Sequence, residues 1–139
     1  MKRKKTCEGL VNKHECINVL KDFSNNKTLA IDGLPAEFCW FFWPDISPDL
    51  LASYNYNYAL QHGTLSISQR RGIISLIPKK SNDKTILENL RPILLLNVDY
   101  KILTKVIAKR IDKVLPTLIN PNQPGYVKGP YNGKNVRLI

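Results

Sequence analysis

Cysteine is scarce in this sequence of 139 residues, and its cysteines are not arranged in pairs. Cys7, Cys16 and Cys39 are odd in number and form no C-x-x-C motif. The pattern therefore indicates neither a disulfide framework nor a zinc ribbon. We expect reduced thiols and an intracellular protein, without a distinction between nucleus and cytoplasm.

Long apolar runs are also missing. The longest spans residues 38–43, far fewer than the roughly 20 residues that a membrane helix needs. The chain begins with Met-Lys-Arg-Lys-Lys, but Thr6-Cys-Glu-Gly follows where a signal peptide would be apolar. We expect no membrane association. Residues 1–11 are interpreted as a solvated basic tail, with a nuclear-localisation or phosphate-contacting role left open.

Acidic residues are few and unevenly placed. The net charge of +10 divides into +4 over residues 1–27, −4 over residues 28–69 and +10 over residues 70–139. A concentrated basic field attracts polyanions, so nucleic acid is the leading partner. The competing interpretation is a basic surface that only keeps the protein soluble.

Three helices are predicted before residue 64. A capping box at Asn12–Glu15 opens a helix that should end near residue 26. A second, aromatic-rich helix should start at Pro35 and end at Pro44, and it must bury its rings. Ser47 and the proline after it predict a third helix, in which the tyrosines are expected to pack in the interior.

A β-hairpin with a long loop is predicted next. Residues 72–77 and 93–96 are short apolar runs bounded by Gly, Pro and polar residues, which favours two buried strands. Lys79 and Lys80 leave the first strand as Arg91 enters the second. Antiparallel pairing would therefore bring three cations to one end of the hairpin, where they could bind phosphate oxygens. A loop with exposed charges is the plain alternative.

A long helix should follow the hairpin. Asn97 is expected to cap it and Pro116 to end it, with an apolar inner stripe between them. Four lysines recur at every fourth residue from Lys101 to Lys113, and a solvated outer face is favoured for them over a docking ridge. The predicted fold class is α+β: amino-terminal helices, a β-hairpin and a long packed helix.

Four blocks of the sequence resemble, in order and spacing, the amino-terminal part of the reverse transcriptase domain of non-LTR retrotransposons, the long-interspersed-element type. They read NNKTLAIDGLPAEFCWFFW, GIISLIPKK, ENLRPILLLNVDYKILTKVIAKRIDKVLP and INPNQPGYVKG. The resemblance covers residues 12–139. It implies an incomplete fingers and early-palm fragment of an RNA-directed DNA polymerase, truncated before the catalytic palm motifs.

The resemblance implies roles for particular residues. Lys79, Lys80 and Arg91 would contact the phosphates of the nucleotide and template. A loop with Gln123, Gly125 and Tyr126 would have a positioning role. The implied partners are RNA template, DNA primer and nucleoside triphosphate. Full-length members use magnesium, but no cofactor or metal site is expected in this chain.

A pair of carboxylates that could hold two metal ions is absent from the sequence. The family places these acids in motifs that these 139 residues do not contain, and Asp99 and Asp112 should face apart on one helix. We therefore expect no polymerase activity from the chain alone. The alternatives are a small basic nucleic-acid-binding or interaction module, or a non-functional relic of a retroelement.

Overall fold

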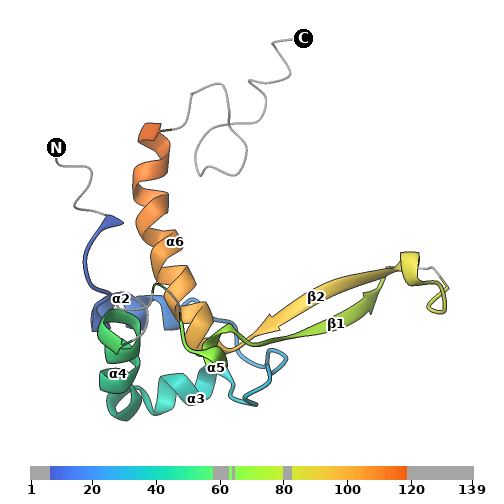
Figure 1. Ribbon diagram of the computed structural model, residues 1–139, viewed down its shortest axis with the longest axis horizontal. Coiled ribbons are helices and arrows are strands. Elements are labelled where there is room, and N and C mark those ends of the chain that lie inside the picture. The colour runs from blue at the N-terminus through green and yellow to red at the C-terminus, as the bar shows by residue number, and fades with distance from the viewer. Residues whose placement is uncertain (1–6, 58–62, 64, 80–82, 119–139) are drawn as a thin grey trace, which may run out of the picture.

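The computed structural model describes residues 7–57, 63, 65–79 and 83–118. In these ranges the chain combines helices with one two-stranded antiparallel sheet, so the predicted α+β class is confirmed. Figure 1 shows the shorter helices gathered around the first half of a long helix, α6, while the hairpin extends outward from this helical body.

The first described helix is α2, Lys13–Leu20. Its predicted capping box is present. The Glu15 amide donates to Asn12 Oδ1 at 2.9 Å, and the Asn12 amide donates to Glu15 Oε2 at 3.1 Å. The helix ends earlier than the predicted residue 26, because the amides of Asp22 and Phe23 bond three residues back instead of four. This tighter turn closes the helix.

Helices α3, Ala36–Phe41, and α4, Trp43–Ala52, meet at a sharp turn. The prediction that Pro44 ends a helix was wrong. Pro44 lies in the first turn of α4, where a backbone amide has no intrahelical acceptor and a proline costs no hydrogen bond. Pro48, expected just after a helix start, lies inside α4.

Two short helices complete this part of the chain: the π-helix η1, Ser53–Asn57, and α5, Ile67–Arg70. Helix α5 was not predicted, although Ser66 and Gln69 form its capping box. Tyr54 is buried, and its hydroxyl donates to the backbone carbonyl of Asp99 at 2.6 Å. The predicted packing role of the tyrosines is confirmed for this residue.

The hairpin consists of β1, Gly72–Pro78, and β2, Leu90–Leu96, which pair antiparallel from Gly72↔Leu96 to Pro78↔Leu90. A single 3-10 turn, η2, Leu87–Asn89, precedes β2. The predicted hairpin is confirmed.

The long helix α6 spans Val98–Leu118. Pro116 lies inside its last turn instead of ending it. The predicted cap at Asn97 was wrong in its chemistry: the side-chain amide donates to the Ser68 carbonyl at 3.2 Å, and the buried Oδ1 has no partner among the described residues. Asn97 therefore ties α6 to α5.

The core lies between α2, α4 and the first half of α6. Its buried members include Cys16, Val19, Trp43, Ile102 and Val106. The predicted inner stripe of α6 is confirmed for Ile102, Leu103 and Val106. Ile107 and Ile111 are 44% and 47% exposed, whereas Arg110, between them in the sequence, is buried and binds Glu15 of α2. Within the described ranges, no helix is long and apolar enough to cross a membrane.

The aromatic rings around α3 are only partly buried, contrary to expectation. Trp43 is in the core, whereas Phe41 is 77% exposed and Trp40 49% exposed. Phe42 contacts Phe38 and Phe41 at centroid distances of 4.8 and 5.0 Å, so part of the apolar surface of these rings is buried among themselves.

Candidate nucleic-acid interface

The predicted meeting of cations at one end of the hairpin is confirmed for two of them. Ile77 stands opposite Arg91 in the register of the two strands. The Lys79 amide donates to the Asn89 carbonyl at 2.8 Å, so the pairing continues one residue past β1. Lys80 lies outside the described residues.

Lys79 and Arg91 belong to the same face of the hairpin. Directly opposed residues point to one side of a sheet, and every second residue of a strand returns to that side. Arg91 therefore shares a face with Ile77, and Lys79 follows Ile77 by two residues. Arg91 is exposed, and in the described part of the chain its guanidinium has no hydrogen-bond or ion-pair partner. Its donors are open to an external anion.

Residues 83–89, beside these cations, are linked by hydrogen bonds among their own polar groups. The Asp83 carboxylate accepts from the Thr85 amide at 2.9 Å and from the Thr85 hydroxyl at 2.8 Å, which lowers the pKa of Asp83. Lys79 Nζ donates to the Glu88 carbonyl at 2.7 Å. Lys84 adds a third cation, but Asp83 and Glu88 offset two of the three charges.

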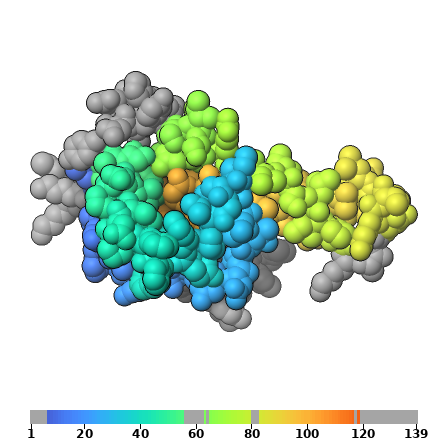
Figure 2. All heavy atoms as spheres, turned by 90° about the horizontal axis from the view of Figure 1, so that it is seen from below, coloured from blue at the N-terminus to red at the C-terminus, as the bar shows by residue number. Residues whose placement is uncertain are grey.

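The strands are exposed, so the expectation of buried strands was wrong. Ile74 is 68% exposed and Leu94, its partner across the hairpin, 54%. Ile77 and Ile93 on the opposite face are also more than 40% exposed. A continuous apolar run is typical of strands covered on both faces. The described residues leave both faces largely open, because the hairpin extends away from the helical body (Figure 2).

Two lysines of α6 do not form the predicted solvated face. Lys105 Nζ donates to the Asp22 carbonyl at 3.2 Å and lies 4.6 Å from the centroid of the Phe23 ring. Lys109 Nζ donates to the Asn18 carbonyl at 3.1 Å and forms an ion pair with the Asp22 carboxylate. Both lysines bind the end of α2, where helix carbonyls are rich in partial negative charge.

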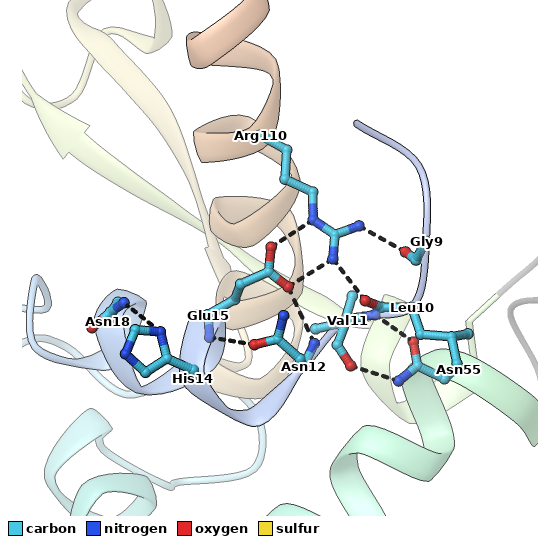
Figure 3. Close-up of polar contacts among 9 residues, drawn as sticks. All are labelled: Gly9, Leu10, Val11, Asn12, His14, Glu15, Asn18, Asn55 and Arg110. Atoms are coloured by element: carbon cyan, nitrogen blue, oxygen red, sulfur yellow. Dashed lines mark hydrogen bonds and ion pairs between the residues drawn. The ribbon is translucent and has the colours of Figure 1, made fainter. Parts of the chain in front are cut away.

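Arg110 is a buried residue that the sequence analysis did not single out (Figure 3). Its Nε and one terminal nitrogen donate to the two carboxylate oxygens of Glu15 at 2.7 and 2.6 Å. The guanidinium also donates to the carbonyls of Gly9 and Leu10 at 2.7 and 2.8 Å. The hydrogen bond from Arg110 lowers the pKa of Glu15. A signal was available, since Arg110 lies four residues after buried Val106 in the apolar stripe.

The acidic residues do not form a metal site in the described part of the chain. No group of three or more His, Cys, Asp or Glu side chains lies close enough there to hold an ion. Asp99 is half-buried, and burial raises the pKa of its carboxyl. Asp112 is exposed.

No protein-family model matches the chain. Over 138 residues the chain is 38% identical to a protein of Xenopus laevis described as the transposon TX1 uncharacterized 149 kDa protein. The match covers 99% of this chain and 10% of that protein, so the chain spans about a tenth of its relative's length. This similarity supports the predicted link to a transposable element.

Three predicted site residues cannot be compared with the geometry. Gln123, Gly125 and Tyr126 lie outside the described residues. Their positioning role stays a prediction, as do the boundaries of a basic tail at residues 1–11 and a polymerase segment at residues 12–139.

Proposed function

We propose that this chain is the amino-terminal part of a reverse transcriptase domain of a non-LTR retrotransposon, and that its hairpin contacts nucleic-acid or nucleotide phosphates. The observation that carries the proposal is the pairing of Ile77 with Arg91, which brings Lys79 and Arg91 to one face and one end of the hairpin. The similarity to a transposon protein over nearly the whole chain supports the same origin.

The two cations suit phosphate in different ways. The guanidinium of Arg91 offers a planar fork that can donate two parallel hydrogen bonds, and Lys79 adds a point charge beside it. Because Arg91 is exposed, water and salt weaken each single contact. Affinity should therefore come from several phosphate contacts together, without readout of base sequence.

The test compares Arg91→Ala with Arg70→Ala in the full chain. Arg70 is also an exposed arginine, but it lies at the other end of the hairpin, just before β1. Fluorescence polarisation of a labelled RNA–DNA primer–template would give both affinities. We expect Arg91→Ala to weaken binding about five- to tenfold, the size of a lost charge-assisted contact, and Arg70→Ala to have a small effect.

Equal losses from Arg91→Ala and Arg70→Ala would reduce the hairpin cations to generic positive charge. That result would favour the alternative of a small basic interaction module.

The chain alone is expected to be inactive as a polymerase. Two-metal catalysis needs carboxylates that hold both ions in line with the reacting phosphate, and the family's carboxylate motifs are absent from these 139 residues. A primer-extension assay with magnesium should give no product above that of a heat-inactivated sample. Incorporation of nucleotides by the chain would contradict this expectation.

A further inference from the structure

A cavity of about 300 Å³ lies at the base of the hairpin, opposite to the end that holds Lys79 and Arg91. The loop after α2, the last residue of β2 and the first turns of α6 form its walls. Figure 2 shows this loop, in blue, next to the base of the hairpin. The volume is at the lower end of the range for small-molecule sites.

The cavity is lined by three lysines, and two of them are available. Lys105 is held by the Asp22 carbonyl and the Phe23 ring. Lys27 is exposed and Lys101 half-buried, and neither ammonium has a hydrogen-bond or ion-pair partner among the described residues. Asp22 is the acid in the lining, and its carboxylate already pairs with Lys109. The positive charge of this cavity is therefore uncompensated.

The cavity also has an apolar wall. Phe23, Leu34 and Leu96 contribute to the lining, and Leu34 is 38% exposed. A ligand with a flat apolar part could cover these side chains while its anionic part contacts the ammonium groups. A site that combines cations with an aromatic ring is typical of nucleotide binding, because a base can pack against the ring while phosphate pairs with lysine.

We propose that this cavity binds a nucleoside phosphate, with Lys27 and Lys101 on the phosphate and the base against Phe23 and Leu34. The two available ammonium groups match the double negative charge of a terminal phosphate. The ligand can be a free nucleotide or one unit of a nucleic-acid strand. This site does not depend on the hairpin cations, since the five residue steps of β2 from Arg91 to Leu96 separate them by about 17 Å.

The groove between α2 and α6 lacks this property. Lys21 and Lys113 also line it, but its two acids, Glu15 and Asp22, already pair with Arg110 and Lys109. A ligand there would have to break ion pairs that hold the two helices together. The cavity at the hairpin base combines Lys27 and Lys101 with an apolar wall that includes the Phe23 ring.

The test titrates adenosine monophosphate into the full chain labelled with nitrogen-15. Amide shifts are expected at residues 23–36 and 96–105, the segments that line the cavity. The double variant Lys27→Gln/Lys101→Gln should weaken binding about tenfold or more, since it removes two charge-assisted contacts. The matched control is Lys13→Gln/Arg70→Gln, which removes the same charge from exposed positions outside the cavity and should bind as the parent chain does.

Titrations with other ligands and with a conservative variant identify which part of the ligand is bound. Inorganic phosphate and adenosine, each alone, should bind more weakly than the monophosphate, because each uses half of the site. Lys101→Arg should retain binding. If an RNA of about ten nucleotides, long enough to span the hairpin at roughly 3.4 Å per phosphate, is weakened by the double variant, the ligand is a strand unit. If only the monophosphate is weakened, the ligand is a free nucleotide.

Three results would overturn the proposal. The first is an equal loss of affinity for the monophosphate in the double variant and in its control. The second is inorganic phosphate binding as tightly as the monophosphate. The third is amide shifts confined to residues 77–91. Amide shifts at residues 77–91 on addition of primer–template report on the hairpin site, and shifts at residues 23–36 and 96–105 on addition of the monophosphate report on the cavity. Failure of this site is therefore distinguishable from failure of the hairpin site. Unchanged circular dichroism of each variant ensures that lost binding is not lost folding.

Discussion

Arg110 holds the amino-terminal segment of the described chain against α6. One guanidinium binds the Glu15 carboxylate and the carbonyls of Gly9 and Leu10, which come from residues about a hundred positions earlier in the sequence. Glu15 at the same time completes the capping box of α2. Asn55 adds to this arrangement, with two hydrogen bonds to the backbone of Val11 (Figure 3). A few polar side chains therefore fix the chain entry to the helical body.

We predict that Arg110→Ala destabilises the fold by about 2–3 kcal/mol, because the variant leaves a partly buried carboxylate and two carbonyls without their donor. Arg70→Ala, which removes an exposed arginine, should change the free energy of unfolding by less than about 0.5 kcal/mol. Urea denaturation followed by circular dichroism measures both. Similar free energies for the two variants would show that the Arg110 network contributes nothing net.

The stability difference between the parent chain and Arg110→Ala should depend on pH. Arg110 lowers the pKa of Glu15 in the folded state, so the pair contributes fully above the ordinary glutamate pKa of about 4.3. Its contribution is lost as the pH falls through the lowered pKa. Burial raises the pKa of Asp99 in the folded state, which by itself makes the fold less stable as the pH rises. This effect is the same in the parent chain and in Arg110→Ala, so it cancels in the stability difference. Urea titrations should show a smaller difference in the free energy of unfolding between the two proteins at about pH 3 than at about pH 7. An equal difference at both pH values would contradict the role of the Arg110–Glu15 pair.

The hairpin and α6 show how differently two apolar elements can be used. Ile102 and Val106 of α6 are almost completely buried and hold α6 to the helical body. Ile74 and Leu94 form a cross-strand pair on the open face of the hairpin, where more than half of each side chain is exposed. An isolated two-stranded hairpin has little stability of its own in water.

We predict that Ile74→Thr/Leu94→Thr leaves the free energy of unfolding within about 1 kcal/mol of the parent value, because threonine suits a strand and little buried area is lost. The same variant should reduce self-association, since it removes an exposed apolar patch. Ile102→Ala should instead cost about 2–5 kcal/mol. Urea denaturation and sedimentation velocity measure the two effects, and a large loss of stability in the threonine variant would mean that the hairpin face is covered in solution.

The whole molecule separates its charges in space as well as in sequence. The acidic residues 28–69 contribute α3 and α4, whereas the basic residues 70–139 contribute the hairpin and α6. Lys109 and Arg110 form ion pairs with Asp22 and Glu15 within the protein. The positive charge that the surface offers to a ligand is therefore smaller than the net charge of +10 suggests. Binding to nucleic acid should therefore be weak and mainly electrostatic.

We predict that RNA affinity falls linearly with salt on a log–log scale, with a slope of roughly −0.7 for each phosphate contact on a single strand. Mixed-sequence and homopolymer RNAs of one length should bind alike, because phosphate contacts carry no base information. Arg91→Ala should reduce the slope by about one contact. Polarisation titrations across a salt series measure this, and a strong preference for one sequence at raised salt would contradict it.

Local signals in the sequence determined most of the secondary structure. The Asn12–Glu15 capping box, the two apolar runs of the hairpin and the stripe of Ile102 and Val106 each depend on residues within a few positions of one another, and each was predicted. The positions of the prolines were misjudged for a local reason as well. Pro44 is compatible with either a helix end or a first turn, and it lies in the first turn of α4, whereas Pro48 lies inside that helix.

Partners and burial were decided by the tertiary structure, because they depend on segments far apart in the chain. The same four-residue spacing that predicted a solvated lysine row places Lys105 and Lys109 against the end of α2, more than eighty residues away in sequence. The hairpin runs looked buried but extend beyond the helical body, and Lys27 meets Lys101 at a cavity that no sequence spacing marks. Sequence alone indicated most of the helices and both strands, although not α5 or the start of α4, and three-dimensional packing decided which of their charges stayed open to a ligand.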